Sequence, residues 1–493
     1  MIKDKPYRVR FAPSPTGHVH LGSARTALFD FLIAQQTGGQ FILRIEDTDR
    51  KRLVEGAEQE LMDSLKWLGI HYDEGPDIGG PYGPYRQSER KDIYLKYANE
   101  LIELDKAYPC FCTPERLGQV RQEKQAQKQL PHYDGLCRGL TNHEARNRME
   151  SGESYVIRFK SPKEGSTVVK DLLRGEIEFE NKNLDDFILV KTDGWALYHL
   201  AAIVDDYLMK ITHVIRGSEW LSTSPLHSLI WNAFGWEEPV WVHLSVFLKP
   251  SGKGKMSKRE AAQLSQDGYS IFIKDLMELG YLPAAVNNWI ALMGWSYDDH
   301  TEFFTMQDLI EKFSLEKLNP SPAAINFSKL DHFNKLHIKA LSNRELAEKV
   351  KPYFEARGIH ADLEMLSELS PVISERLVTL DDAVDFCAFI FLDEIEISKE
   401  SLLIKDKSVS DVYKIADDAY QILDGVESWD VLSLEDTLKG YMEKQGLTPQ
   451  GFYGFLREAI SGQRVTPPLF ESMAVLGKEK TLERISDAKA LFA

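Results

Sequence analysis

The chain has 493 residues, of which 43% are hydrophobic and 27% charged, and its formal net charge is −17 at pH 7. This length predicts three or four domains, and the composition excludes a disordered chain. No apolar run approaches the roughly 20 residues that span a bilayer, no secretory signal is seen, and four cysteines make no disulfide framework. We therefore expect a cytoplasmic protein with no membrane partner. Its acidity does not exclude nucleic acid, because RNA affinity depends on where the Lys and Arg residues cluster.

The first part of the chain alternates strand and helix patterns. Residues 7–12 predict a short strand, and an apolar-periodic helix follows it and ends at Gly38 and Gly39. Residues 40–46 predict a second strand, and residues 54–68 predict a second helix. This order predicts a doubly wound α/β fold, in which right-handed crossovers leave a crevice at the carboxyl ends of the strands.

The middle of the chain differs in its sequence pattern from the segments on either side. Residues from about 86 to 189 combine a charged helix, a cysteine-bearing segment and short strands, which indicates an insertion between two halves of the α/β fold. The second half is expected to resume near residues 187–190 and to contain a helix at residues 198–208, a strand at 211–216 and a helix with Ser224 as N-cap and Pro225 in its first turn. From about residue 330 onward the pattern is almost entirely helical.

The segment Pro13-Ser14-Pro15-Thr16-Gly17-His18-Val19-His20-Leu21-Gly22 fills the turn between the first strand and the first helix. Such a turn presents free backbone N–H groups and the positive end of a helix dipole, which suits phosphate. Gly17 and Gly22 allow a close backbone approach, and His18 and His20 can donate to phosphate oxygens as charge develops in a displacement. An isolated Gly-x-x-His would instead indicate a polar turn with a capping histidine, but the ten-residue context favours a phosphate site.

A second motif, Lys255-Met256-Ser257-Lys258-Arg259, follows Gly252 and Gly254. Two lysines three positions apart on a glycine-flanked loop can fold over the β- and γ-phosphates and stabilise charge in the transition state. The alternative is a solvated basic surface loop, which is the commoner fate of a Lys-rich pentamer. Its position downstream of the segment from Arg216 to Trp220 favours the phosphate-binding interpretation.

Together and in this order, the two motifs resemble the signatures of class I aminoacyl-tRNA synthetases, and the surrounding residues narrow the resemblance to the bacterial glutamyl-tRNA synthetase family. The segments 80–88 and 171–175 also match, and the resemblance extends over essentially the whole chain. The class signature His-Ile-Gly-His is represented here by His20-Leu21-Gly22-Ser23. The second histidine is absent, which the glutamate branch tolerates, and His18 is not assigned its role.

The resemblance implies a fold class and a domain order. The fold is expected to be α/β, with a Rossmann-like doubly wound parallel sheet, an inserted α+β connective domain, a stem-contact region and an all-helical anticodon-binding domain. The expected ranges are 1–85 for the first half of the catalytic domain, 86–189 for the connective, acceptor-binding domain, 190–240 for the second half, 241–335 for the lysine loop and stem-contact domain, and 336–493 for the anticodon-binding domain.

The resemblance also implies the substrate sites. Bidentate recognition of carboxylates favours arginine, and Arg10 and Arg216 both close predicted strands that end at one crevice; for each, the alternative is a surface ion pair. Glu46 is placed to take an ammonium group, and Ala202 stands where the family often has a polar residue, which puts contacts there in doubt. The glutamate-binding residues are expected to be Arg10, Ala12, Ser14, Glu46, Tyr198 and Arg216.

For ATP and for catalysis the resemblance implies an overlapping set of residues. We expect His20, Gly22, Lys255 and Lys258 to be catalytic. The ATP-binding residues are expected to be Pro13, Gly17, His20, Gly22, Glu219, Lys255, Met256, Ser257, Lys258 and Arg259.

The implied activity is that of a glutamate-tRNA ligase. Glutamate would attack Mg·ATP to give glutamyl-adenylate, and the terminal ribose of tRNA(Glu) would then accept the glutamyl group; bound tRNA is expected to be needed for activation, and the enzyme is expected to be a monomer. A truncated paralogue that glutamylates a tRNA base lacks the helical C-terminal part, and a non-catalytic tRNA-binding protein would not need His20, Gly22, Lys255 and Lys258. Both alternatives are therefore disfavoured. The sequence leaves open whether tRNA(Gln) is also charged.

Three cysteines have the spacing of an incomplete zinc site. Cys110 and Cys112 are separated by Phe111, 24 residues lie between Cys112 and Cys137, and thiolates so spaced suit tetrahedral zinc. Some family members have a histidine at the position of Gly139, and His132 or His143 would have to replace it. Buried, inert thiols are the competing interpretation, and we predict no metal.

The helical C-terminal part has the place of an anticodon-binding cage in the family. Unpaired bases are recognised by stacking and by polar contacts to their edges. Phe452, Tyr453, Phe455 and Arg457 are candidates, although aromatic residues at helical spacing are more often core. Arg376 aligns with an arginine that the family links to the third anticodon base, and it is therefore expected to favour tRNA(Glu) over tRNA(Gln).

Overall fold

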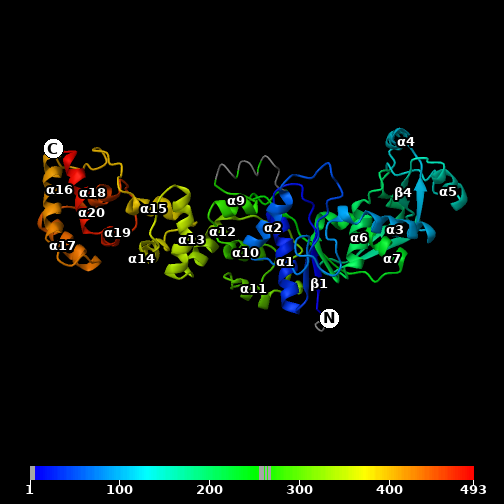
Figure 1. Cartoon of the computed structure of the whole chain (residues 1–493), viewed down its shortest axis with the longest axis horizontal. Helices are drawn as coiled ribbons and strands as arrows, with labels where there is room; N and C mark the ends of the chain where they lie inside the picture. The colour runs from blue at the N-terminus through cyan, green and yellow to red at the C-terminus, as the bar shows by residue number, and fades with distance from the viewer. Residues whose placement is uncertain (1–5, 255–259, 261–263, 265–267) are drawn as a thin grey trace. The chain divides into compact units, whose positions relative to one another are not determined.

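The computed structural model describes residues 6–254, 260, 264 and 268–493. The chain forms two compact units, one made of Met1–Leu276 with Val286–Phe327 and the other of Met277–Ala285 with Ser328–Ala493. The first unit mixes strands and helices, and the second is helical (Figure 1). Within the described ranges, every helix is too short or too polar to cross a bilayer.

The first unit begins with the predicted strand–helix–strand–helix order. Strand β1 (Arg8–Phe11), helix α1 (Leu21–Thr37), strand β2 (Gln40–Leu43) and helix α2 (Ala57–Trp67) follow one another, and β1 pairs in parallel with β2 from Arg8↔Gln40 to Phe11↔Leu43. Helix α1 ends at Gly38, whose φ of +62° is a left-handed conformation that glycine adopts without strain. This confirms the predicted stop at that glycine.

The second half of the nucleotide fold lies beside β1. Helix α6 (Tyr198–Leu208) has the predicted bounds, and it leads to the parallel strands β8 (His213–Gly217) and β9 (Val240–Leu244). The backbone N–H of Thr212 donates to the carbonyl of Arg8 at 2.8 Å, which joins β8 to β1. The carboxyl ends of these strands are where a doubly wound sheet binds its ligands.

Helix α7 (Ser224–Phe234) begins one residue earlier than predicted. A 3₁₀ helix, η3 (Ser218–Thr223), runs directly into it, so Thr223 is the N-cap and Ser224 is already helical, with φ −57° and ψ −39°. The prediction that Ser224 is the N-cap is therefore wrong. Its hydroxyl is free to accept a hydrogen bond from elsewhere in the unit.

The insertion contributes to two sheets. Its helices are α3 (Lys91–Glu103), α4 (Pro114–Ala126) and α5 (Asn142–Glu150). Strands β3 (Ala107–Cys110), β4 (Val156–Phe159) and β7 (Ile188–Val190) form an antiparallel sheet. Strands β5 (Ser166–Asp171) and β6 (Gly175–Glu180) form a hairpin, and the last residue of β5 pairs in parallel with Trp241 of β9. This pairing brings Asp171 to the α/β sheet.

Shorter elements follow β9. They are β10 (Phe247–Leu248), α9 (Ile273–Glu278), α10 (Pro283–Leu292), α11 (Met306–Lys312), β11 (Ala323–Ala324) and α12 (Phe327–Lys339), and β10 pairs in parallel with β11.

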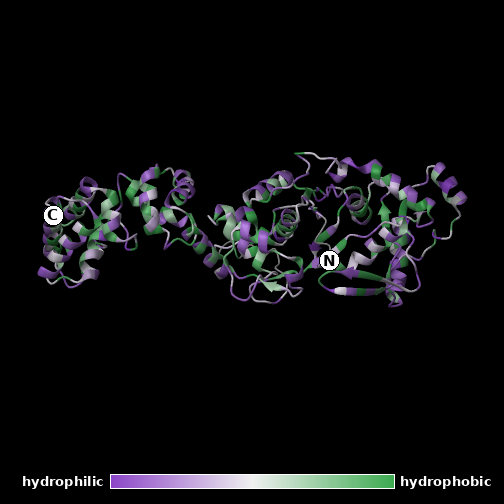
Figure 2. Ribbon diagram, turned by 90° about the horizontal axis from the view of Figure 1, so that it is seen from below, coloured by the Kyte–Doolittle hydropathy of each residue, from purple (hydrophilic) through white to green (hydrophobic). Residues whose placement is uncertain are grey.

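The second unit confirms the prediction of an all-helical C-terminal part. It contains α13 (Asn343–Ala356), α14 (Leu363–Ile373), α15 (Asp382–Phe391), α16 (Val409–Asp424), α17 (Val431–Lys444), α18 (Pro449–Ser461), α19 (Leu469–Leu476) and α20 (Lys478–Ala490). These helices carry both hydrophobic and hydrophilic residues, as expected for helices with one buried face (Figure 2). Phe452 and Phe455 lie in the core of this unit, so neither ring offers a face to a base.

Candidate active site

A buried group of charged residues lies beneath the carboxyl ends of β1 and β2. The guanidinium of Arg44 donates to Asp206 Oδ1 at 2.7 Å and to Glu46 Oε1 at 3.2 Å, and Arg10 Nε donates to the same Asp206 oxygen at 3.0 Å. Asp206 comes from α6, so these contacts join three elements of the unit. Burial alone would raise the pKa of Asp206, but Arg10 and Arg44 outweigh it and lower that pKa.

Asp205, the neighbour of Asp206 on α6, binds the segment that follows the Gly- and Pro-rich stretch. It accepts hydrogen bonds from Arg90 Nε at 2.7 Å, Tyr94 Oη at 2.8 Å and Gln87 Nε2 at 2.9 Å. One helix therefore orients both the strand ends and the start of the insertion.

Glu46 combines burial with access to the site. Burial raises its pKa to about 6, although Arg44 and Arg10 partly offset this effect. Its backbone N–H donates to the carbonyl of Pro13 at 2.9 Å, which fixes it beside the first motif. At neutral pH the carboxylate is ionised, as binding of a substrate ammonium requires.

Arg216, at the end of β8, is buried among neutral acceptors. Its Nε donates to His243 Nε2 at 2.9 Å, one terminal nitrogen contacts His227 Nδ1 at 2.9 Å and Tyr198 Oη at 3.3 Å, and the other contacts Ser224 Oγ at 3.2 Å. In the described part of the chain no carboxylate forms an ion pair with it. A buried guanidinium with no anionic partner is prepared to bind a carboxylate from a ligand.

Tyr198 and Trp220 flank this arginine. Their rings lie 4.4 Å apart between centroids, and Trp220 is 37% exposed, so this side of the site opens to solvent. Burial raises the pKa of Tyr198, and Arg216, Glu46 and Arg10 all act on it electrostatically, which brings four of the predicted glutamate-binding residues to one place.

The other residues predicted to bind glutamate make fewer polar side-chain contacts. Ala12 is half-buried after β1, and Ser14 is exposed in the turn, where its carbonyl accepts from Thr16 N. Ala202 is buried within α6 and offers no polar atom on its side chain, so the doubt raised by this departure from the family pattern stands.

His20 is the N-cap of α1. Its Nδ1 accepts hydrogen bonds from the backbone N–H groups of Gly22 at 3.0 Å and Ser23 at 3.3 Å. The expectation of free N–H groups at this turn is therefore wrong, because the imidazole already occupies them. A neutral ring that accepts at Nδ1 carries its proton on Nε2, which lies 3.3 Å from Ser23 Oγ. Desolvation lowers the pKa of His20, and Glu219 opposes the shift.

The remaining residues of the first motif lie at the surface. Gly17 is exposed and has a φ of +149°, a conformation that side chains rarely adopt. His18 does not lie free for phosphate, because its Nδ1 contacts Glu60 at 2.7 Å. The placement agrees with leaving His18 without a catalytic role.

The segments on both sides of the second motif lie against the N-terminal end of α1. On the far side, Leu21 N donates to Ile271 O and Ile273 N donates to Val19 O, both at 2.9 Å. On the near side, Arg25 of α1 donates to the carbonyl of Ser245 and stacks over the ring of Phe247 at 4.0 Å.

The lysine motif itself lies outside the described residues. This applies to Lys255, Met256, Ser257, Lys258 and Arg259. Glu219, also predicted to bind ATP, acts electrostatically on both His20 and Arg25 and therefore belongs to the same corner of the unit.

The three cysteines of the insertion form one cluster. Their Sγ atoms lie within 4.8 Å of one another. The phenol oxygen of Tyr133 lies 3.4 Å from Cys110 Sγ and 3.3 Å from Cys112 Sγ, and it accepts from Cys137 N at 2.8 Å. The Tyr133 oxygen is thus a fourth potential metal ligand beside the three sulfur atoms. For this fourth position the sequence suggested only histidines.

A pair of arginines marks the second unit. Arg376 donates to the carbonyl of Thr466 at 2.9 Å, and Arg457 Nε donates to the hydroxyl of the same residue at 3.1 Å. Burial lowers the pKa of Arg457, and the charge of Arg376 lowers it further. Neither arginine forms an ion pair with a carboxylate of the described chain.

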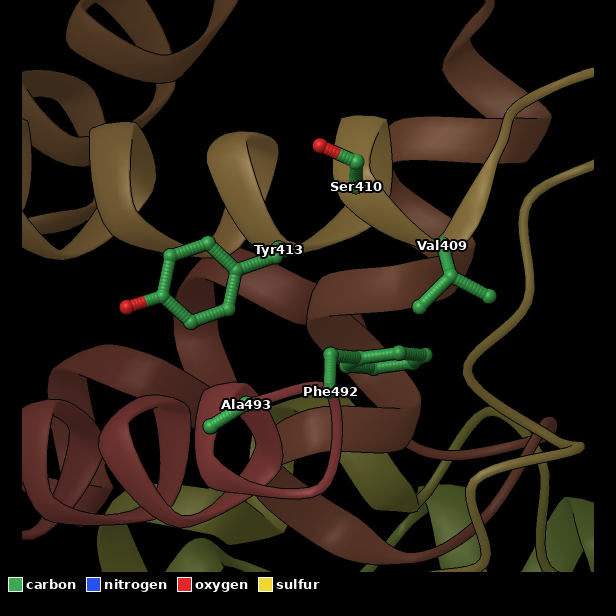
Figure 3. A pocket seen from close by; sticks show the side chains of 5 residues that line it. All are labelled: Val409, Ser410, Tyr413, Phe492 and Ala493. Carbon is green, nitrogen blue, oxygen red and sulfur yellow. The ribbon is translucent and has the colours of Figure 1, made fainter.

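A cavity of about 480 Å³ lies elsewhere in the second unit. Figure 3 shows its lining, in which Tyr413 of α16 and Phe492 near the C-terminus are the largest side chains. The lining contains no titratable side chain except Tyr413 and none of the predicted site residues. The cavity therefore adds nothing to the chemistry of the candidate site.

Sequence reasoning missed most of the groups that hold the site residues. Asp171 and Trp220 lay inside quoted motifs but received no role. His227, His243 and Asp206 carried no signal, because nothing in their local sequence sets them apart from ordinary core residues.

Two family profiles match the chain. The profile described as tRNA synthetases class I (E and Q), catalytic domain, matches residues 6–332, and the profile described as an anticodon binding domain matches residues 345–489. The chain therefore belongs to the class I tRNA synthetases of the glutamate and glutamine branch.

Within that branch, similar proteins are glutamate–tRNA ligases. The enzyme of Dehalococcoides mccartyi is 42% identical over 488 residues, which cover 98% of each chain. That of Chloroflexus aurantiacus is 42% identical over 499 residues and covers 98% of each chain. The crystal structure of a glutamate tRNA ligase from Elizabethkingia meningosepticum, in complex with its amino acid, has a TM-score of 0.90 at 35% identity, covering 99% of this chain and 100% of its own.

Proposed function

We propose that this chain is a glutamate–tRNA ligase that forms glutamyl-adenylate from L-glutamate and ATP and transfers the glutamyl group to the 3′ end of tRNA(Glu). The observation that carries the proposal is the meeting of the histidine corner with both flanks of the lysine motif at the N-terminal end of α1. The similarity to glutamate–tRNA ligases over nearly the full chain supports it.

The charges of the site suit glutamate in one orientation. In the first step an α-carboxylate oxygen attacks the α-phosphorus of ATP and pyrophosphate leaves, so the α-carboxylate must point toward the nucleotide at His20. Glu46 then takes the ammonium group, and the buried Arg216 takes the side-chain carboxylate in a bidentate contact. Arg10, already paired with Asp206, supports the same carboxylate with its remaining N–H groups.

The nucleotide is held by the two motifs. His20 donates from Nε2 to a phosphate oxygen, and Lys255 and Lys258 stabilise the charge that develops on the leaving pyrophosphate. Pro13, Gly17 and Gly22 shape the turn, Glu219 stands beside it, and we expect Met256, Ser257 and Arg259 to contact the nucleotide as well. Mg²⁺ is expected to bind as a complex with the triphosphate. Such a cation takes most of its ligands from phosphate and water, and the Glu219 carboxylate is suited to supply one further ligand.

The domain division extends to tRNA. We assign residues 86–189 to the acceptor end, 241–335 to the stem and 336–493 to the anticodon, as predicted from the sequence. Arg376 and Arg457, both bound to Thr466 and to no carboxylate of the described chain, are the groups that we expect to contact the anticodon. We further propose a monomer that acts in the cytoplasm.

The match of an anticodon binding domain to residues 345–489 disfavours the truncated tRNA-modifying paralogue. The uncompensated charge of Arg216 disfavours a protein that binds tRNA without using an amino acid.

The proposal is tested by charging purified tRNA(Glu) and tRNA(Gln) side by side with glutamate and ATP. We expect glutamyl-tRNA(Glu) to form and pyrophosphate exchange to require tRNA. Glutamylation of tRNA(Gln) at the same rate would show that Arg376 does not discriminate, and absence of any charging would refute the ligase function.

Arg216→Ala is expected to raise the KM for glutamate by about 100-fold or more, since it removes two charge-assisted hydrogen bonds worth about 1.5–3 kcal/mol each. The KM for ATP should change little and serves as the internal control. Steady-state charging kinetics measure both constants. An unchanged KM for glutamate would remove Arg216 from the site.

The raised pKa of Glu46 predicts that kcat/KM for glutamate depends on pH. Its pKa of about 6 means that the carboxylate loses its charge as the pH falls through that value. We expect kcat/KM for glutamate to fall roughly tenfold per pH unit below about pH 6. Glu46→Gln should have a low kcat/KM at all pH values and should lose this dependence; a variant that keeps the wild-type profile would assign the titration to another group.

We also propose that the cysteine cluster binds one Zn²⁺, with Tyr133 as the fourth ligand, in place of our prediction of no metal. Three thiolates and the Tyr133 oxygen provide the four donors of a closed tetrahedral site, in which the metal would displace the phenol proton. The guanidiniums of Arg116, 3.4 Å from Cys112 Sγ, and of Arg158, over the Tyr133 ring, suit its negative charge.

Elemental analysis should find one zinc per chain. Tyr133→Phe should lower the zinc content after dialysis against a chelator, whereas His132→Ala and His143→Ala should not. A folded wild-type protein without zinc would restore the no-metal prediction.

A further inference from the structure

The two shortest contacts of the Arg216 guanidinium are with imidazoles, and the longer ones are with the hydroxyls of Tyr198 and Ser224. His243 Nε2 and His227 Nδ1 each lie 2.9 Å from one of its nitrogens, and both rings are buried. A guanidinium has only donors, so both of these ring nitrogens must be unprotonated acceptors. This requirement fixes the tautomer of each ring.

Each histidine is oriented by a group behind it. His243 must carry its proton on Nδ1, which lies 2.7 Å from Asp171 Oδ2, and the same oxygen accepts from the backbone N–H of His243 at 3.0 Å. His227 must carry its proton on Nε2, which lies 3.0 Å from His199 Nδ1. Two relays, Asp171–His243 and His199–His227, therefore end on one arginine.

The position of Asp171 is fixed from the other side as well. Its Oδ1 accepts from the backbone N–H groups of Leu173 and Arg174, both at 3.0 Å, in the turn between β5 and β6. Both oxygens of this fully buried carboxylate are thus committed, and the hairpin of the insertion supports the Arg216 site through the β5–β9 pairing.

We propose that the Asp171–His243 pair is a positioning and specificity-determining element, which holds Arg216 in the orientation that binds the side-chain carboxylate of the substrate and makes the enzyme prefer glutamate to glutamine. This inference rests on the proposed glutamate site. The same logic applies to ligands of a metal, whose orientation and basicity are set by a carboxylate behind a histidine.

Neutral acceptors explain how the preference arises. A carboxylate in direct contact with Arg216 would fix the guanidinium but would also cancel its charge. An imidazole fixes the guanidinium equally well and does not cancel its charge. The carboxylate of Asp171 is separated from the guanidinium by the ring of His243. The uncompensated cation then attracts a carboxylate, whereas a neutral carboxamide would leave the buried charge without a partner.

Asp171→Asn tests the proposal because it changes almost no volume. The amide oxygen can still accept from Leu173 and Arg174, but the amide nitrogen now faces both the Nδ1–H and the backbone N–H of His243. The ring must move its proton to Nε2, where it opposes the N–H of Arg216. An Asp→Asn change behind a catalytic histidine disturbs the tautomer in the same way.

We expect Asp171→Asn to raise the KM for glutamate by about 10- to 100-fold, the usual cost of losing such a supporting group. The kcat at saturating glutamate and the KM for ATP should stay near wild type. The inhibition constant of L-glutamine in the same charging assay should change less. The ratio of this inhibition constant to the KM for glutamate should therefore fall.

A second pair of variants guards against misfolding. His243→Gln keeps an oxygen acceptor for Arg216 and should have the milder effect; His243→Phe keeps the ring without an acceptor and should resemble Asp171→Asn. His213→Gln, which alters another buried imidazole, on β8, for which no contact with Arg216 is seen, should leave the KM for glutamate unchanged.

Arg216→Lys combined with Asp171→Asn completes the test as a double-mutant cycle. If Asp171 acts through Arg216, the double variant has the KM of Arg216→Lys alone. Three outcomes would overturn the inference while leaving the ligase function intact. They are additive effects of the two substitutions on the KM for glutamate, an equal rise in the KM for glutamate and in the inhibition constant of glutamine, and an unchanged KM for glutamate in folded Asp171→Asn. A wild-type enzyme that does not charge tRNA with glutamate would instead refute the proposed function.

Discussion

The buried guanidinium of Arg44 is the constraint on which the site depends. It is fully enclosed, and it is held by Asp206 and Glu46, with Asp205 Oδ2 3.7 Å away. Burial alone would lower the pKa of Arg44, but the three carboxylates outweigh this effect and raise it. Removing one partner of such a group leaves an uncompensated buried charge, at a cost of about 3–5 kcal/mol. The positions of β2, α6 and Glu46 are therefore not independent of one another.

The two predicted carboxylate-binding arginines are in opposite electrostatic states. Arg10 shares Asp206 with Arg44 and so belongs to a compensated network. Arg216, one strand away, contacts only neutral atoms in the described chain, and burial together with the charge of Arg10 lowers its pKa. A substrate with two carboxylates and an ammonium group therefore meets an asymmetric site: an available cation at one end and an ionised Glu46 at the other. This asymmetry is the basis of the orientation that we propose for glutamate.

The parts of the site that follow from local pattern could be predicted from the sequence. The strand and helix periods place Arg10 and Arg216 at strand ends, and the topology of a doubly wound sheet brings such ends together. The groups that orient Arg216 could not be predicted, because Asp171 and His243 are 72 positions apart and meet only through the pairing of β5 with β9. Tyr133, the proposed fourth ligand at the cysteine cluster, could not be predicted because phenols are rarely counted as metal ligands. The capping of α1 by His20 was considered only for an isolated motif and then set aside.

The acidic composition and the binding of RNA are compatible because charge acts locally. A chain with a net charge of −17 repels a polyanion on average, so binding depends on cations that carboxylates do not neutralise. Arg376 and Arg457 meet this condition, since both donate to Thr466 and each opposes the other's charge. Two like charges so placed are unfavourable until an anion lies between them. In the other unit the charge of Arg10 likewise lowers the pKa of Arg216, although Arg10 itself is paired with Asp206. A negatively charged ligand at Arg376 and Arg457, or at Arg216, relieves this electrostatic cost, so such a ligand is favoured at these positions despite the acidic composition of the chain.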